Sequence, residues 1–159
     1  MNKILLLFVG ILISTLVQAS PEEKEKINIK TYYIDDSLVF MYLDTISFYI
    51  DSLDIKEPKY VLAQTLLETG WFDCNNCAWS KGNNLFGFKG NRGYIKYSSW
   101  IESVHAYKRW QNRKYTAYLN KYPNGTYLDF LSRCGYSESS SYKKNVYYMT
   151  LWLDKNYYN

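Results

Sequence analysis

A single carboxylate, Glu68, stands in the otherwise uncharged stretch LAQTLLETGWF. If a helix stops at Gly70, Glu68 lies in its last turn, where the negative end of the helix dipole disfavours a charged carboxylate. Apolar neighbours such as Trp71 remove water from the carboxyl and disfavour the charge further. Both effects raise the pKa, and a protonated carboxyl can donate to a leaving oxygen. The pattern indicates a general acid; a structural ion pair or a solvent-facing side chain is the alternative.

The residues around Glu68 predict the elements that position it. Pro58 at a first helical position and Gly70 at a stop predict a helix over 58–69, and apolar residues on nearly all its faces predict that it is central and buried. Residues 35–54 carry apolar side chains at helical spacing with acidic ones between them, which predicts an amphipathic helix. Its inward face should comprise Leu38, Met41, Tyr42, Ile46, Tyr49, Ile50 and Leu53.

The remaining chain predicts a small hairpin followed by three helices. In NNLFGFKGNRGYIKYSSW, β-like runs over 85–89 and 94–97 flank the turn-rich residues 90–93. Ser99 and Glu102 have the spacing of a capping box at the start of a helix. A short helix ending at Gly135 and a terminal helix from about Ser140 follow. The fold class predicted is α+β, predominantly α, with one small β-hairpin.

Four motifs occur in order along the chain: AQTLLETGWF, NNLFGFKG, YSSWIESVHAYKRW and FLSRCGYSESSSYKKNV. Together they resemble the bacterial glucosaminidase family, glycoside hydrolase family 73, over roughly residues 60–149. The resemblance implies a lysozyme-like domain that hydrolyses peptidoglycan at the β-1,4 bond after N-acetylglucosamine. It also implies that Glu68 is the catalytic acid and that Tyr136 lies near the cleaved bond.

The same resemblance implies which residues contact the sugar. The run NNLFGFK matches the segment that lines the cleft opposite the acid, and Tyr142 belongs to the motif of Tyr136. The expected substrate-binding residues are Trp71, Asn84, Phe86, Lys89 and Tyr142. The expected partner is the peptidoglycan glycan strand, bound by a monomer, and neither a cofactor nor a metal ion is expected.

Hydrolysis needs a second group on the other face of the sugar, either a carboxylate or the substrate's own 2-acetamido group. Asp73, Glu102 and Glu138 are the candidate carboxylates, but its capping-box spacing already gives Glu102 a structural role. In substrate assistance, the acetamido oxygen attacks the anomeric carbon, and the hydroxyl of Tyr136 orients or polarises the acetamido group. A position in the core is the structural alternative for Tyr136.

Two other functions compete with hydrolysis. A lytic transglycosylase also works with one glutamate but forms an anhydro sugar, and such enzymes typically follow the glutamate with a GLMQ-like run where this chain has NNLFGFK. A non-catalytic module that binds cell-wall glycan would reuse the groove without releasing fragments. The end group of the released product separates the first two functions, and the absence of product identifies the third.

Residues 1–19 have the pattern of an export signal, with a lysine, an apolar run and small residues at the cleavage positions. The apolar run is shorter than the roughly 20 residues that a spanning helix needs. We expect cleavage after Ala19, a charged tether over 20–30 and a glucosaminidase domain over 31–159, periplasmic or extracellular and without stable membrane insertion. The net charge of +4 is not gathered in one basic run, which, with export, argues against a nucleic-acid partner.

Three cysteines are present, and an exported chain favours a disulfide over a redox or metal site. Cys74 and Cys77 form a C-x-x-C without a surrounding βαβ pattern, so we expect them to be oxidised. Cys134 is then a buried free thiol, or the partner of one of the other two. A zinc site that combines the three cysteines with His105 lacks the usual paired spacing.

Overall fold

The computed structural model describes residues 36–159. The expected signal peptide at 1–19, the tether at 20–30 and the start of the domain at residue 31 lie outside the described residues. Between 36 and 159 the chain forms six helices and one antiparallel hairpin, namely α1 (Asp36–Ser52), α2 (Pro58–Thr69), α3 (Ala78–Gly82), β1 (Lys89–Gly90), β2 (Gly93–Tyr94), α4 (Trp100–Lys121), α5 (Tyr127–Arg133) and α6 (Tyr142–Asn156). This confirms the predicted fold class.

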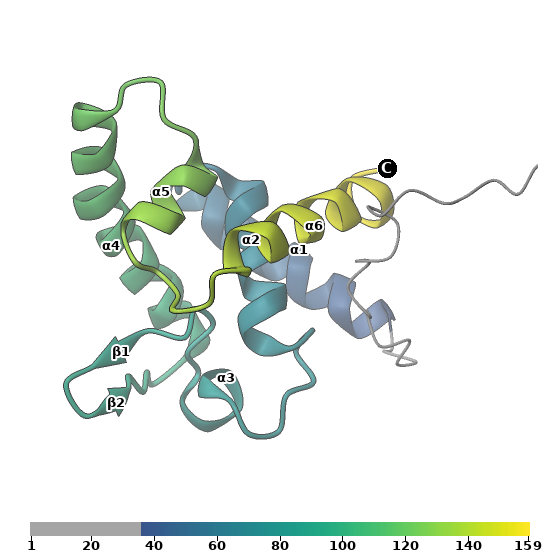
Figure 1. The fold of residues 1–159 in the computed structure, drawn as a ribbon. Coiled ribbons are helices and arrows are strands. Elements are labelled where there is room, and N and C mark those ends of the chain that lie inside the picture. Colours follow the sequence, from purple (N-terminus) through teal and green to yellow (C-terminus); the bar gives the residue numbers. More distant parts are fainter. Residues whose placement is uncertain (1–35) are drawn as a thin grey trace, which may run out of the picture. The chain divides into compact units, whose positions relative to one another are not determined.

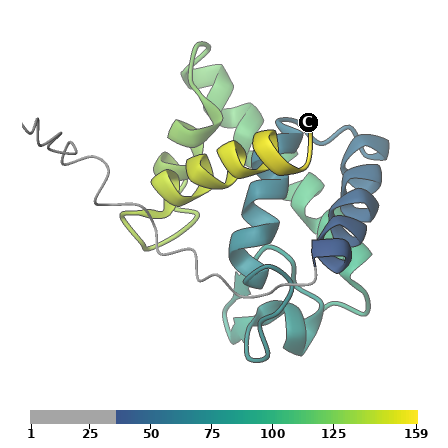
Figure 2. The same ribbon diagram turned by 90° about the vertical axis from the view of Figure 1, so that its right-hand side faces the viewer.

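Helix α2 is the central element of the described residues, as Figure 1 shows. It packs most extensively against α6, and α1 runs beside it (Figure 2). Residues 61–66 are all buried, because the apolar side chains of this helix face neighbours on every side. Pro58 begins the helix and Gly70 ends it with a φ of 54°, so that the N–H of Trp71 reaches the carbonyl of Leu66 at 2.9 Å. The predicted bounds of this helix are confirmed.

Helix α1 buries a stripe that agrees with the predicted one only in part. Val39, Leu43, Ile46 and Ile50 are buried at helical spacing, whereas Leu38 is 45 % exposed and Met41 is 53 % exposed. The helix itself was predicted correctly, but Leu38 and Met41 do not belong to its inward face. The burial stripe is set by the surface of α2 and α4 against which α1 packs, which apolar spacing alone does not specify.

The hairpin is shorter than predicted. β1 and β2 pair Lys89 with Tyr94 and Gly90 with Gly93, so only two residues of each expected run form ladder pairs. The preceding residues Leu85 and Phe86 are fully buried in the core instead of pairing in a strand. Burial of these two side chains draws the chain into the interior, and the hairpin begins only where the chain emerges.

The predicted capping box at the start of α4 is formed in part, because Ser99 caps the helix but the Glu102 carboxylate bonds to Ser98 instead of to the N–H of Ser99. The N–H of Glu102 donates to the Ser99 hydroxyl at 3.4 Å, and the Glu102 carboxylate accepts from the N–H of Ser98 at 3.0 Å. These bonds satisfy amide groups that have no partner inside the helix. None of the helices described between 36 and 159 is long and apolar enough to cross a membrane.

Candidate active site

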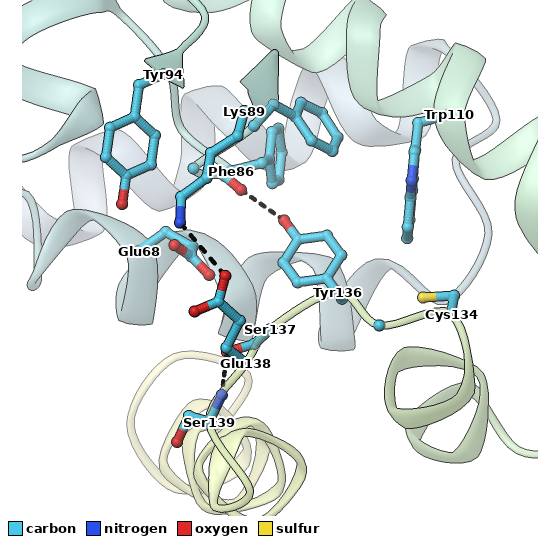
Figure 3. Close-up of a pocket in the computed structure, with 13 residues that line it drawn as sticks. Glu68, Phe86, Lys89, Tyr94, Trp110, Cys134, Tyr136, Ser137, Glu138 and Ser139 are labelled. Atoms are coloured by element: carbon cyan, nitrogen blue, oxygen red, sulfur yellow. Dashed lines mark hydrogen bonds and ion pairs between the residues drawn. The ribbon is translucent and has the colours of Figure 1, made fainter. Parts of the chain in front are cut away.

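A groove of about 460 Å³ opens above the C-terminal end of α2. Glu68 lines it from α2, residues 86–89 and Tyr94 line it from the hairpin region, and Trp110 lines it from α4. Residues 134–139, which connect α5 to α6, form the facing wall. Figure 3 shows these side chains converging from separate elements on the space beside the Glu68 carboxyl.

The two carboxyl oxygens of Glu68 have different surroundings. Oε1 accepts a hydrogen bond of 2.9 Å from the hydroxyl of Tyr142, the first residue of α6. Oε2 lies against Gly87, since a Cβ atom added there would be 2.5 Å from this oxygen. Gly87 also has a φ of 62°, which a side chain rarely adopts, so both space and backbone require glycine. One oxygen of Glu68 is therefore anchored behind the groove, and the other lies at its lining.

The pKa of Glu68 is raised above its ordinary value, chiefly because burial removes water from the charged form. The hydrogen bond from Tyr142 and the positive charge of Lys89 act in the opposite direction and do not cancel the effect of burial. The raised pKa was predicted from the sequence, and the side chain is half-buried in the structure.

Lys89 and Glu138 form an ion pair of 3.9 Å from opposite walls of the groove, close to Glu68 (Figure 3). The Glu138 side chain is 99 % exposed and that of Lys89 is 59 % exposed, so water screens their attraction. The Lys89 ammonium also lies 5.4 Å from the ring centre of Tyr94. Both charges are thus held weakly and are free to reorient toward a bound polymer.

Tyr136 lies in the wall opposite the hairpin. Its hydroxyl donates to the Phe86 carbonyl at 2.7 Å, which joins the α5–α6 connection to the NNLFGFK segment. The ring stacks on Tyr142 with centroids 5.4 Å apart and meets Trp110 edge-on at 5.2 Å. Burial raises the pKa of Tyr136 well above its ordinary value, so this hydroxyl stays protonated at neutral pH.

Two of the other residues expected to bind substrate, Asn84 and Tyr142, lie behind the groove surface, whereas Phe86 lines the groove but is nearly buried. Asn84 is fully buried, and its side chain bonds to the backbone of Phe88 and Ile95 at 2.9–3.0 Å, which shapes the loop. Phe86 is 1 % exposed, and its carbonyl rather than its ring faces Tyr136. Tyr142 holds Glu68 from behind.

The remaining predicted residues divide between the groove and other surfaces. Lys89 lines the groove, whereas Trp71 lies outside it and packs edge-on against Trp152 of α6 with centroids 4.6 Å apart. Among the candidate second carboxylates, Glu138 lines the groove and Glu102 caps α4. Asp73 is exposed in the loop after α2 and does not line the groove.

Sequence reasoning missed Gly87 and Gln64. Gly87 stands at the centre of the motif LFGFK, and a glycine between two aromatic residues is a local signal of close approach. Gln64 is fully buried on α2 and donates to the Tyr142 hydroxyl at 3.1 Å, one helical turn before Glu68. A lone amide in the apolar run LAQTLL was the available signal, since a buried amide needs partners.

Cys74 and Cys77 are joined by a disulfide in the loop after α2, as predicted. Cys134 is a half-buried free thiol whose pKa is raised by burial. Within residues 36–159, no three His, Cys, Asp or Glu side chains lie close enough together to hold a metal ion, and His105 is exposed.

A helical domain that places a half-buried carboxyl of raised pKa at the base of an open groove has the features of a glycoside hydrolase. A model of the glucosaminidase family, described as mannosyl-glycoprotein endo-beta-N-acetylglucosaminidase, matches residues 50–151. This match spans more than half of the chain, and the chain belongs to the glucosaminidase family. No curated protein sequence matches the chain significantly.

Proposed function

We propose that this glycoside hydrolase cleaves the β-1,4 bond after N-acetylglucosamine in peptidoglycan and that Glu68 is its general acid. The observation that carries the proposal is the placement of Glu68, with Oε1 held by Tyr142 and Oε2 beside Gly87 at the groove. Burial raises its pKa and so favours the protonated form that an acid catalyst needs.

In the proposed reaction, Glu68 gives its proton to the glycosidic oxygen as the bond to the anomeric carbon breaks. The carbonyl oxygen of the 2-acetamido group forms a new bond to that carbon and closes an oxazolinium ring. Water then attacks the anomeric carbon, the ring opens, and the Glu68 carboxylate takes a proton from the water. The two displacements regenerate the acid and retain the anomeric configuration.

The carboxylates at the groove favour substrate assistance over a mechanism with a second catalytic carboxylate. Apart from Glu68, the only carboxylate lining it in the described part of the chain is Glu138. That side chain is almost fully exposed and paired with Lys89, so nothing desolvates or fixes it as an attacking group. A role for Glu138 as a general base remains the alternative, and it would require the loop to place this side chain under the sugar.

Tyr136 is suited to orienting the acetamido group by accepting a hydrogen bond. Its hydroxyl proton is already directed at the Phe86 carbonyl, but the oxygen keeps a lone pair for a substrate N–H. Holding the acetamido N–H there would leave the acetamido carbonyl free to attack the anomeric carbon. Lys89, which lines the hairpin side of the groove, is suited to contact hydroxyl or carboxylate groups of the glycan.

Peptidoglycan is the proposed substrate because the ordered motifs of this chain resemble enzymes of bacterial cell walls. Its strands carry carboxylates, which suit the exposed ammonium of Lys89 and the positive net charge of the chain. We place the domain, residues 31–159, outside the cytoplasm after removal of the expected signal. The family description names mannosyl-glycoproteins, so a high-mannose glycoprotein belongs in the test as a second substrate.

The test is mass spectrometry of purified peptidoglycan after digestion, with Glu68→Gln digested in parallel. The expected products end in reducing N-acetylglucosamine, and the variant should release none. Fragments ending in reducing N-acetylmuramic acid would contradict the proposed bond, and anhydro ends would identify a lytic transglycosylase. Binding without release by the parent protein would identify a glycan-binding module. Glycan release from the glycoprotein alone would assign the substrate class that the family description names.

A further inference from the structure

A continuous chain of buried hydrogen bonds leads from Glu68 through the core to the backbone of Lys56, at the opposite end of α2. It consists of three tyrosine hydroxyls and two glutamine amides from four helices, and we call it the amide–hydroxyl chain. Its members, in order from Glu68, are Tyr142, Gln64, Tyr107, Tyr127 and Gln111. Every one of these side chains is buried or nearly so. In the reaction proposed above, only the Glu68 end of this chain has a role.

The direction of the amide–hydroxyl chain is set at Lys56. The amide oxygen of Gln111 accepts from the Lys56 N–H at 2.7 Å, and its Nε2 donates to the Lys56 carbonyl at 2.7 Å. These two bonds fix which end of the Gln111 amide is nitrogen, because the reverse orientation would oppose like groups at both positions. The same Nε2 lies 3.2 Å from the Tyr127 hydroxyl, so this hydroxyl accepts from Gln111.

The remaining directions follow because each hydroxyl has one proton. Tyr107 lies 2.5 Å from the Gln64 amide oxygen and donates to it, so the proton shared by the two tyrosines comes from Tyr127. The nitrogen of the Gln64 amide then faces Tyr142 at 3.1 Å and donates to it. In this arrangement every hydroxyl of the amide–hydroxyl chain has an acceptor for its proton, and the proton of Tyr142 points at Glu68.

From this we infer that the amide–hydroxyl chain is a positioning device that keeps the acidic proton of Glu68 on Oε2, the oxygen beside the groove. Oε1 receives the Tyr142 proton and cannot also donate to that hydroxyl while the chain keeps its direction. The members beyond Tyr142 make no hydrogen bond to Glu68 and do not line the groove, although the Tyr107 ring packs against Phe86 and Trp110 of the lining. Their hydrogen bonds therefore reach Glu68 through Tyr142 alone, and a change from tyrosine to phenylalanine leaves the ring packing in place. This inference rests on the proposed role of Glu68 as general acid.

If the direction were free to reverse, a protonated Glu68 could donate from Oε1 to Tyr142, and the Gln64 amide would turn over. That state stabilises the acid form and aims its proton away from the glycan. The groups that face Glu68 from other elements would still act on it in either state, so the test must leave them intact; they are Lys89 on β1, Tyr94 on β2, and Tyr136 and Glu138 on the α5–α6 connection.

The experiment compares Tyr107→Phe with the matched control Tyr115→Phe on soluble peptidoglycan fragments across a range of pH. Tyr107→Phe removes the donor that fixes the Gln64 amide. Tyr115 is also buried and packs against Tyr127, but its hydroxyl bonds to Glu57, which is not a member of the amide–hydroxyl chain. For Tyr107→Phe we expect kcat to fall about tenfold with KM nearly unchanged, and the alkaline limb of kcat to move up by about half a pH unit. Tyr115→Phe should retain the parent profile.

Two further measurements keep the inference testable if Tyr107→Phe does not fold. Gln111→Met, at the far end of the chain, should shift the alkaline limb in the same direction by a smaller amount. In the parent protein, the infrared carboxyl band that disappears in Glu68→Gln should have the low frequency of a carbonyl that accepts a hydrogen bond, because Tyr142 donates to Oε1. A band at the frequency of a free carbonyl would place the proton on Oε1 and overturn the inference.

The outcomes separate this inference from the proposed function. If Tyr107→Phe and Gln111→Met fold and keep the pH profile of Tyr115→Phe, while Glu68→Gln is inactive, the positioning role is wrong and the acid assignment stands. If Glu68→Gln remains active, the proposed function is wrong, and the inference about its proton is wrong with it.

Discussion

The two sides of Glu68 differ in how firmly they are held. Behind it, Tyr142 and Gln64 belong to a buried set of hydrogen bonds in which every donor has a partner. In front of it, the groove has an exposed ion pair at 3.9 Å and a glycine without a side chain. Buried hydrogen bonds fix the positions of the groups that they join, whereas an exposed wall can adapt its side chains to a polymer. For the function proposed above, this difference means that buried contacts would orient Glu68 while the exposed groove would recognise the glycan.

The largest loss of activity should come from replacing Glu68, which lies between the buried hydrogen bonds and the groove. Glu68→Gln keeps an oxygen for Tyr142 but cannot give up a proton, so hydrolysis should fall by at least about 10²–10⁴-fold. Assays on purified peptidoglycan measure the loss, and sugar binding should persist. Activity within about tenfold of the parent, in a folded variant, would remove Glu68 from the acid role.

The same variant makes a prediction for stability. Because the pKa of Glu68 is raised in the folded state, the native protein binds this proton more tightly than the unfolded chain does. The group therefore favours folding at low pH, and this contribution is lost as the pH rises through the folded pKa. The melting temperature of Glu68→Gln should therefore fall less than that of the parent as the pH rises through the folded pKa of Glu68. Near neutral pH, the melting temperature of the variant should equal or exceed that of the parent.

The next largest loss of activity should come from adding a side chain at the groove beside Oε2 of Glu68. Gly87→Ala would place a Cβ atom 2.5 Å from Glu68 Oε2 and displace the carboxyl, so kcat should fall about tenfold or more. Gly93→Ala is the control, since its φ of 103° is also positive, no atom lies within 4 Å of the added Cβ, and Gly93 does not line the groove. Both variants should lose about 1 kcal/mol to backbone strain, measured by denaturant unfolding. Equal activity in the two would show that contact with Oε2 is unimportant.

A smaller effect should follow from removing the positive charge at the front. Lys89 lowers the pKa of Glu68, so Lys89→Met should raise it and move the alkaline limb of the pH–rate profile upward. Glu138→Gln, which removes the partner of Lys89 and keeps its size, should leave the alkaline limb nearly in place. A downward shift in Lys89→Met would mean that another group controls this limb.

The smallest effect on activity should come from Glu102. Its carboxylate accepts from Ser98 at the start of α4, away from the groove, so Glu102→Gln should keep nearly full activity. Loss of the negative charge at the helix N-terminus should cost up to about 1 kcal/mol of stability, read from thermal melts. A loss of activity comparable with that of Glu68→Gln would make Glu102 the second catalytic carboxylate.

What the sequence predicted is what local chemistry determines. Pro58 and Gly70 mark the ends of α2 through their own backbone preferences, and the spacing of Ser99 and Glu102 marks the start of α4. Glu68 could be singled out as a candidate because a lone carboxylate at an apolar helix end is costly to desolvate. These features depend on neighbours within about four residues along the chain.

The missed features depend on contacts between distant segments. Tyr142 was expected in the groove but lies behind Glu68, which is 74 positions away in sequence. Gln64 meets Tyr107 across 43 positions, and no local pattern announces that pairing. Trp71 turns toward α6 and away from the groove because Trp152 offers it a packing surface. Side-chain direction at such positions is decided by tertiary packing, which a single sequence does not contain.

The buried tyrosine hydroxyls also give the protein an optical report of its own unfolding. Burial raises the pKa of Tyr107, Tyr136 and Tyr142 well above the ordinary value for tyrosine. As the solution becomes alkaline, these buried phenols lose their protons when the chain unfolds, because the unfolded state releases them more readily. Ultraviolet absorbance of tyrosinate should therefore rise steeply at the pH of unfolding, and this rise marks alkaline denaturation without any added dye.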